Sequence, residues 1–542
     1  MNFLKVNHMK KTKSKYIFLL LILGFSACTQ DFLELQPKTN KLETNFYKSE
    51  DDAFLALSAV YNALHVQNWQ FVPTMSDIKS DDAFTGGDPS GNDMPQYQQQ
   101  EKFTIDLENA AVSALWSRCY SGIYRANILL DKIGQIEWKN DANKTRITAE
   151  AKFLRAYFYW DLVRHYGWVP ILTKVESNPD ILNSLPQSTP QDVYKQIATD
   201  LLDAQIGLPQ TVPDAEIGRA TKYAVNSLIA RIYLYYEGFA KPVLGITENW
   251  SNGTTTIDKT FVKTALNEVI TSGSFIVLPK YADVFDWANE NNKEMIFSFQ
   301  YDGSSASGDW GGWGINGNFS SISLGPRDPE GDASIVAGWS MSPLSFSLAA
   351  EYEVGDPRKD VSMYNAAVKL TKYTKGFQNT GFFNNKFLAQ SAYQSAKGEK
   401  AHNYPINYPD IRFADVLLMA AEINLTDNPT QAVQYFNIVR TRALGIGGAK
   451  VSITLDDIYH ERRLEFAGEG HRYWDLLRRG LDYAEQKINA SFLNIPTDNP
   501  MISPVDFAPR NFVKETYGMF PIPAGEVRIT SGNLKQFIPA YK

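Results

Sequence analysis

The sequence predicts a mostly α-helical protein built from helix pairs, with one large irregular insertion. Apolar residues recur at helical spacing in segments toward both ends of the chain, where Ala and Tyr are frequent at the packing positions. Residues 241–410 lack this spacing, and short β-like runs alternate there with Gly, Ser, Asn and Trp. Helix pairs joined by short polar turns are typical of tetratricopeptide-like bundles, although no strict repeat of about 34 residues is present.

The chain begins with a segment that predicts export. Lysines are concentrated in residues 5–15, an apolar run covers residues 16–25, and the first acidic residue is Asp31. A basic, then apolar, then small-residue order is typical of a signal peptide. The apolar run is about half as long as the roughly 20 residues that a membrane-spanning helix needs, so we do not expect it to remain in the bilayer.

The end of this segment predicts a lipid anchor. Residues 23–28 read LGFSAC, which is close to the bacterial lipobox, the pattern whose cysteine receives lipid before the signal is cut ahead of it. We therefore predict a signal peptide at residues 1–27, lipidation of Cys28 and a tether at residues 28–48. The alternative is a simple secretory cleavage site beside an ordinary cysteine. With Cys28 acylated, Cys119 has no partner, so no disulfide is expected.

The N-terminal helical part is predicted at residues 49–240. Ser49, which precedes three acidic residues, is a helix start signal, because its side-chain oxygen caps the first turn and the helix dipole favours acids there. In residues 146–167 two neighbouring rows of apolar side chains predict a helix that is buried on both sides. The helices expected in this part cover residues 49–65, 111–133, 146–167, 189–209 and 218–240.

The rest of the chain divides into the insertion and a second helical part. The insertion is predicted at residues 241–410, and a C-terminal helical part follows at residues 411–542. The helices expected in the C-terminal part lie within residues 411–425, 428–444 and 460–480.

Composition and charge narrow the class of function. With 44% hydrophobic and 13% aromatic residues, the chain is predicted to fold throughout. Its net charge of −7 becomes more negative when the lysine-rich signal is removed, which argues against a nucleic-acid partner. Many aromatic residues beside only six histidines suit apolar recognition surfaces, such as those that bind carbohydrate, better than metal chemistry.

The most charged motif lies at residues 460–480 and reads HERRLEFAGEGHRYWDLLRRG. His471 and Asp475 are four residues apart, as are Glu461 and Glu465, so an acid–base pair or a metal site is one reading. The many arginines in the same segment would oppose a divalent metal. The other reading, which we favour, is two helices joined at the glycines and braced by arginine–carboxylate pairs.

Aromatic residues near glycine are the candidate ligand contacts. Trp310 and Trp313 lie in a glycine-rich run with no periodic face to bury them, so their rings are candidates to stack on the apolar face of a sugar. The amide of Asn318 is a candidate to bond sugar hydroxyls. Tyr97 and Trp69 are weaker candidates of the same type. The alternative is that the two tryptophans only pack the loop onto the scaffold.

Several segments together resemble the SusD/RagB family of outer-membrane nutrient-binding lipoproteins of Bacteroidetes. They run in family order over nearly the whole chain, and as a set they are highly specific. The segments are CTQDFLELQP, AEAKFLRAYFYWDLVRHYGWVP, GRATKYAVNSLIARIYLY, YADVFDWANENNKEMIFSFQY, YPDIRFADVLLMAAEINL, ERRLEFAGEGHRYWDLLRRG and PIPAGEV. The resemblance implies a SusD-like fold, in which a bundle of tetratricopeptide-like helix pairs carries an irregular, ligand-bearing portion.

The resemblance also implies a function. Members hold an oligosaccharide or another nutrient over a SusC-like TonB-dependent transporter and release it for import, anchored by lipid in the outer membrane and facing the cell exterior. Two regions usually contribute ligand contacts, and these correspond here to residues 69–97 and 301–318, which adds Tyr301 to the candidates.

The resemblance points to a binding protein and not to an enzyme. We expect no catalytic residue, no metal and no cofactor, and no sequence feature indicates a bound calcium ion. The alternatives are a surface glycan hydrolase with an unrecognised carboxylate pair, and a protein that binds a non-glycan nutrient such as peptides.

Overall fold

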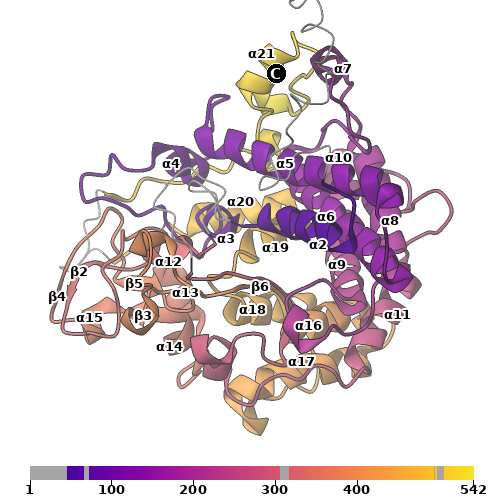
Figure 1. Ribbon diagram of the computed structural model, residues 1–542. Coiled ribbons are helices and arrows are strands. Elements are labelled where there is room, and N and C mark those ends of the chain that lie inside the picture. The colour runs from indigo at the N-terminus through magenta and orange to yellow at the C-terminus, as the bar shows by residue number, and fades with distance from the viewer. Residues whose placement is uncertain (1–45, 66–71, 305–315, 493–494, 497–505) are drawn as a thin grey trace, which may run out of the picture.

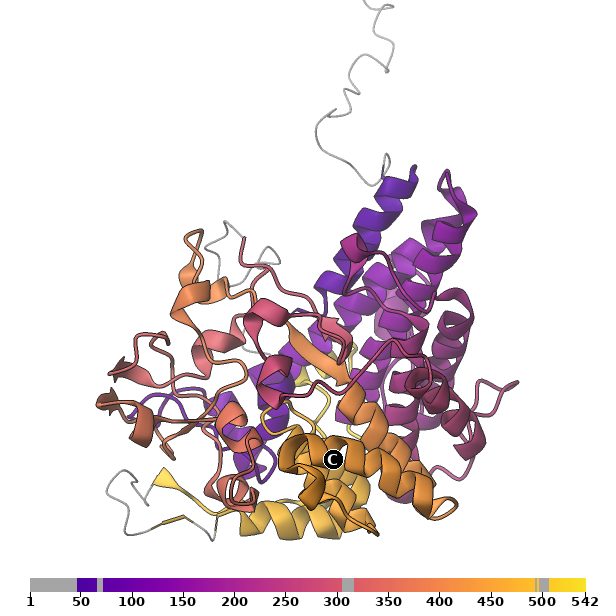
Figure 2. The same ribbon diagram turned by 90° about the horizontal axis from the view of Figure 1, so that it is seen from below.

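The computed structural model describes residues 46–65, 72–304, 316–492, 495–496 and 506–542, and these are mostly helical, as predicted. In Figure 1 the N-terminal helices stack on one side of the molecule and the insertion with its short strands lies on the other, and Figure 2 gives the same division from below. The helices of the first half are α2 (Glu50–Asn62), α3 (Val72–Asp77), α4 (Pro95–Lys102), α5 (Ala110–Lys132), α6 (Asp141–Tyr166), α7 (Pro179–Ser184), α8 (Pro190–Gly207), α9 (Lys222–Tyr235), α10 (Lys241–Leu244) and α11 (Lys259–Ile270).

Helix α6 packs against α2, α5 and α8. Every residue from Phe153 to Tyr166 is buried, which confirms the helix buried on both sides that its two apolar rows predict. Helix α2 begins as predicted. Ser49 and Asp52 form a capping box, in which each side chain accepts a hydrogen bond from the backbone N–H of the other residue.

The helical stack continues past residue 240. Helix α11 buries Val262, Leu266 and Val269 and packs against α9 and against α16 (Phe413–Asn424). The predicted insertion, residues 241–410, therefore includes one helix of the scaffold, and its irregular part begins after α11. Because α11 and α16 are neighbours in space, the insertion leaves the helical stack and returns to it at the same place.

A two-stranded sheet closes the base of the insertion. Strands β1 (Met295–Phe299) and β6 (Tyr408–Arg412) pair antiparallel, and β6 leads directly into α16. Phe297 and Phe299 of β1 pack edge-on against Phe153 and Tyr157 of α6. The end of β1 is therefore fixed against the N-terminal helices.

The remaining elements of the insertion are short. Strand β2 pairs with β4, and β3 with β5, both antiparallel. In chain order the elements are α12 (Ser320–Ser323), β2 (Arg327–Glu330), α13 (Phe346–Glu351), α14 (Arg358–Ser362), β3 (Met363–Asn365), α15 (Ala366–Lys369), β4 (Lys372–Thr374) and β5 (Phe382–Asn384).

The C-terminal part is helical, as predicted. After α16 come α17 (Pro429–Leu444), α18 (Leu455–Glu465), α19 (Arg472–Arg479), α20 (Leu481–Ala490) and α21 (Ala524–Ile529). The turn between α18 and α19 contains Gly468 and Gly470, both with positive φ, where the sequence places the joint between two helices. None of the helices in the described ranges combines the length and the apolar character that crossing a bilayer requires.

The arginines of the charged motif are buried beside carboxylates, which confirms the bracing interpretation. Arg462 donates to Asp415 at 2.6 Å and to Asp475 at 2.8 Å. Arg463 donates to Asp82 at 2.7 Å, and this carboxylate belongs to the segment after α3. The motif therefore ties the C-terminal helices to a segment near the start of the chain.

Candidate functional site

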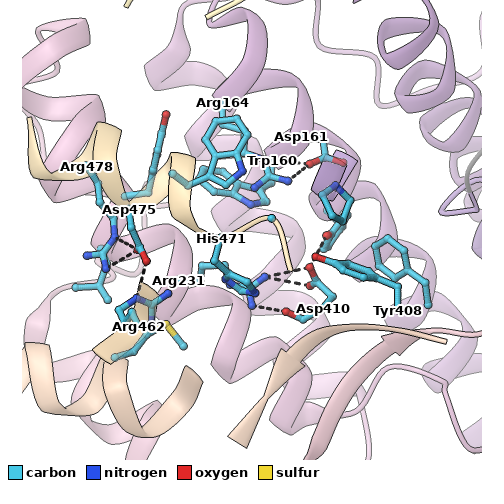
Figure 3. Close-up of a pocket in the computed structure, with 18 of the residues that line it drawn as sticks. Trp160, Asp161, Arg164, Arg231, Tyr408, Asp410, Arg462, His471, Asp475 and Arg478 are labelled. Carbon is cyan, nitrogen blue, oxygen red and sulfur yellow. Dashed lines mark hydrogen bonds and ion pairs between the residues drawn. The ribbon is translucent and has the colours of Figure 1, made fainter. Parts of the chain in front are cut away.

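Charged side chains surround a small enclosed cavity of about 50 Å³, lined by residues of α6, α9, β6, α18 and α19. A cavity of this size holds a few water molecules and no larger ligand. In Figure 3 each carboxylate faces an arginine: Asp161 faces Arg164, Asp410 faces Arg231, and Asp475 lies between Arg462 and Arg478. The carboxylates that line this cavity are thus all engaged in ion pairs.

His471 and Asp475, the acid–base pair that the sequence raises as one reading, both line this cavity. Burial, with a contribution from Arg231, lowers the pKa of His471 to about 3, so its ring is neutral at physiological pH. Asp475 already accepts from two arginines. Across the residues that the structure describes, no cluster of three or more His, Cys, Asp or Glu side chains is arranged to hold a metal ion. The ion pairs of the charged motif therefore brace the fold.

A larger cavity opens to solvent at the C-terminal end of α2, and we call it the α2 pocket. Its volume is about 330 Å³, within the range of small-molecule binding sites. Three segments that are distant in sequence form its walls: the end of α2, the loop before α9, and the end of β1. The lining residues are Ser58, Tyr61, Asn62, Leu64, His65, Ala215, Glu216, Ile217, Gly218, Arg219, Ser298, Phe299, Gln300 and Asn316.

His65 joins the end of α2 to the end of β1. Its Nε2 lies 2.6 Å from the carbonyl oxygen of Gln300, and because a carbonyl only accepts, Nε2 carries the proton. Burial lowers the pKa of His65, so the ring is neutral at physiological pH. The ring also stacks on Tyr301 with centroids 4.7 Å apart. His65 is thus held in one orientation at the pocket wall.

The wall formed by the end of β1 is a network of side-chain amides. Gln300 and Asn291 exchange two hydrogen bonds of 2.9 Å, and the amide nitrogen of Asn407 donates to Gln300 at 3.0 Å. Gly218 lies against the Gln300 side chain, since a Cβ built on this glycine would meet Gln300 at 2.3 Å. Its φ of +98° also favours glycine. The loop before α9 can approach the amide network only because residue 218 has no side chain.

The charged side chains that line the α2 pocket already have partners. Tyr61 donates to Glu150 at 2.6 Å and accepts from the backbone N–H of Ala220 at 2.8 Å. Arg219 lies 3.5 Å from the same carboxylate, and Glu216 forms an ion pair with Arg146. The pocket thus offers amides, an imidazole and partly buried rings, with its charges neutralised within the protein. Such walls suit an uncharged, hydroxyl-rich ligand better than an ionic one.

The structure places the predicted contact residues at different depths. Tyr301 is 7% exposed and lies behind His65, so it supports the pocket through its ring. Asn318 is fully buried, and its amide donates to the carbonyl of Ile406 at 3.0 Å. Tyr97 is 2% exposed, in helix α4. Both side chains are thus buried in this structure, and their roles as ligand contacts stay predictions.

The other predicted residues lie outside the described residues; they are Cys28, Trp69, Trp310 and Trp313. In the sequence, Trp69 comes four residues after His65, and Trp313 comes three residues before Asn316. His65 and Asn316 both line the α2 pocket.

Sequence reasoning missed His65, Gln300 and Arg219. His65 is a polar residue at the end of the first predicted helix, and its position just before the segment that holds Trp69 was a usable signal. No signal in the sequence marks Gln300 as a site residue, because a single polar residue after an apolar strand is common. Arg219 belongs to the GRAT segment quoted for the family resemblance, and its spacing alone indicates no site.

The partly buried carboxyl group of Glu290, behind the amide wall, is expected to make the stability of the fold depend on pH. One of its carboxylate oxygens accepts from the backbone N–H of Asn407 at 2.5 Å, and burial raises its pKa from 4.5 to about 7. The folded state therefore holds this proton more tightly than the unfolded state. Its contribution to stability is greatest below pH 4.5 and falls as the pH rises to about 7.

Glu290→Gln keeps the acceptor and removes the charge. We expect it to raise the melting temperature by about 1–3 °C above pH 7, with the gain disappearing near pH 4.5. Melting curves from pH 4.5 to 8, with the exposed Glu515→Gln as control, measure this difference. A gain that does not change with pH would contradict it.

Two family models match this chain in order. The model described as "Starch-binding associating with outer membrane" matches residues 31–234, and the model described as "SusD family" matches residues 351–541. A SusD-like protein P25 from Formosa agariphila is 28% identical over 512 residues, which is 87% of this chain and 90% of the relative. A SusD-like protein from Bacteroides ovatus is 26% identical and covers 84% of this chain and 80% of its own length.

Solved structures share the fold. A laminarin-binding SusD-like protein is 29% identical with a TM-score of 0.76, and covers 90% of this chain and 99% of its own. The surface glycan-binding protein A from Bacteroides thetaiotaomicron, in complex with laminarihexaose, is 26% identical with the same TM-score and the same coverage. Because the models match both helical parts and the relatives align over most of the chain, this protein belongs to the SusD/RagB family.

Proposed function

We propose that this protein is a surface glycan-binding protein that captures oligosaccharides without cutting them. The α2 pocket carries the proposal, because its walls are held in place before a ligand arrives. Hydroxyl groups of a sugar can bond the side chains of Asn62, Asn316 and Ser58, while Leu64, Ile217 and the ring of His65 offer apolar contact. The laminarin-binding neighbour and the laminarihexaose complex support a neutral glucan as the ligand to test first.

The tryptophans that the sequence singles out remain part of this proposal. Trp69, Trp310 and Trp313 belong to the two segments that adjoin His65 and Asn316 in the sequence. An indole that stacks on a sugar ring contributes about 0.5–1.5 kcal/mol beyond its buried area. We propose that at least one of these rings stacks on the bound sugar.

The cellular role that we propose is delivery of the captured glycan to a SusC-like TonB-dependent transporter. The lipobox at residues 23–28 supports a lipid anchor, and the family description of association with the outer membrane supports the location. In this proposal the α2 pocket serves for capture at the exterior face of the outer membrane, and the transporter carries out the import.

Cys28→Ser tests the anchor. Each buried methylene of an acyl chain contributes about 0.8 kcal/mol, so several chains bind practically irreversibly. We expect the variant to leave the membrane fraction and appear in the soluble fraction, measured by fractionation and immunoblot in cells that lack the transporter. Cys119→Ser, which changes the buried cysteine, is the control and should stay with the membrane. A Cys28→Ser protein that still pellets with membranes would contradict lipid anchoring.

A glycan panel tests binding and distinguishes the alternatives. Purified protein is run in native gels that contain laminarin, starch, xylan or mannan, and the incubated mixtures are examined for shorter products. We expect retarded migration with at least one neutral glycan and no shortening of any of them. Shortened products would favour a glycan hydrolase, and retention by peptides but by no glycan would favour a peptide-binding protein.

A further inference from the structure

A second open cavity adjoins the α2 pocket, and we call it the α11 cavity because part of its wall follows helix α11. Its volume is about 300 Å³, and its lining includes Thr211, Ser274, Phe275, Asn292 and Lys293. Those five residues do not line the α2 pocket. Each cavity lies at the lower end of the size range of ligand sites, about 300–1,000 Å³.

The two cavities share one ridge. Ile217, Gly218, Arg219 and Ser298 line both of them. At Gly218 the ridge has no side chain, and a Cβ there would meet Gln300 at 2.3 Å. Beside it the side chain of Ile217 is 47% exposed. Gly218 therefore packs directly on the Gln300 side chain, and the ridge offers the exposed apolar side chain of Ile217 next to it.

An amide pair also connects the cavities. Gln300 lines the α2 pocket and Asn291 lines the α11 cavity, and their side chains exchange two hydrogen bonds of 2.9 Å. This pair fixes the wall of one cavity relative to the wall of the other. A ligand that fills both would therefore meet a groove whose two halves are held at a set distance.

We propose that the α11 cavity is a second subsite for the same glycan, so that a linear chain lies across Gly218 and occupies both cavities. This inference rests on the proposed function. A linear chain with an apolar face in each ring can cross the ridge over Ile217, while Thr211, Ser274 and Lys293 supply polar partners beyond it. A branched or compact ligand would fill only one cavity. The ligand class is thus a linear oligosaccharide longer than one cavity can hold.

Calorimetric titration of the full protein with laminari-oligosaccharides from the disaccharide to the hexasaccharide tests this. We expect the wild-type affinity to rise about tenfold or more from the shortest to the longest chain. Thr211→Met and Ser274→Met place an apolar side chain into the α11 cavity from two different segments. In both variants we expect unchanged affinity for the short chains. The rise in affinity from the short to the long chains should be lost.

Controls separate subsite loss from misfolding. Thr264→Met, at an exposed position of α11 that lines neither cavity, should behave as wild type, and melting curves check that the Met variants fold. If a Met variant does not fold, Lys293→Ala, at an exposed position, replaces it and should lose part of the gain. The second subsite alone would be overturned if the wild type bound all chain lengths with equal affinity. It would also be overturned if the folded Thr211→Met and Ser274→Met proteins kept the full increase in affinity with chain length. If the wild type binds none of these chains but is retarded by another glycan of the panel, the second subsite for a laminarin-type chain is overturned and the proposed function is not. If it binds none of these chains and no glycan of the panel, the proposed function is contradicted as well.

Discussion

Replacing Glu465 with alanine is expected to lower the free energy of unfolding by about 3–5 kcal/mol, because it removes a buried carboxylate that three buried arginines share. Glu465 is fully buried and pairs with Arg442 at 2.5 Å, Arg412 at 3.0 Å and Arg358 at 3.5 Å. Burial alone would raise the pKa of Glu465, but these arginines outweigh it and hold the pKa below its ordinary value. We expect the melting temperature to fall by about 5–10 °C.

The same helices provide a matched control. Asp456 of α18 pairs with Arg479 of α19 at 2.8 Å, and its side chain is 72% exposed. An exposed ion pair contributes about 0–1 kcal/mol, so Asp456→Ala should change the melting temperature little. Asp475→Ala, which breaks buried pairs with Arg462 and Arg478, should resemble Glu465→Ala. If the buried and exposed variants melt alike, the motif does not brace the fold as we describe.

His65→Ala is expected to weaken oligosaccharide binding by several-fold to tenfold. The change removes the ring that stacks on Tyr301 and the hydrogen bond to the Gln300 carbonyl, so the α2 pocket loses an apolar contact and the tie between two of its walls. A ring contact of about 0.5–1.5 kcal/mol corresponds to a change in Kd of this size. Isothermal titration with laminarihexaose measures it.

A conservative variant distinguishes binding from folding. His65→Gln retains a side-chain N–H that can donate to Gln300 and should recover part of the affinity. Melting curves of both variants show whether the fold is intact. An unchanged Kd in a folded His65→Ala protein would place the ligand elsewhere on the molecule.

The helices could be predicted from the sequence because their signals are local. Ser49 caps α2, and the rows of apolar residues in α6 are visible within a few turns. The bracing role of the charged motif was also predictable, since so many buried arginines require carboxylates. The particular carboxylates that pair with these arginines could not be predicted, because Arg463 pairs with Asp82, which lies hundreds of residues away in the sequence.

The site was predictable only as a region. The α2 pocket joins residues near 62, 218 and 300, and this proximity depends on how β1 packs on α6. Asn318 follows a glycine-rich run that suggested exposure, yet a hydrogen bond to Ile406 holds it inside. The sequence predicts the segment of α11 as part of the insertion, because its single apolar row is short and lies among polar residues.

Hydrogen exchange measured by mass spectrometry, with and without saturating laminarihexaose, tests the central claim most directly. If the glycan lies in the α2 pocket, bound ligand slows exchange of backbone amides at residues 58–65, 215–221 and 298–301. Exchange in α17, which contributes no residue to the lining of the pocket, stays unchanged. Protection confined to other segments, or no protection despite measured binding, would contradict the assignment of the α2 pocket as the glycan site.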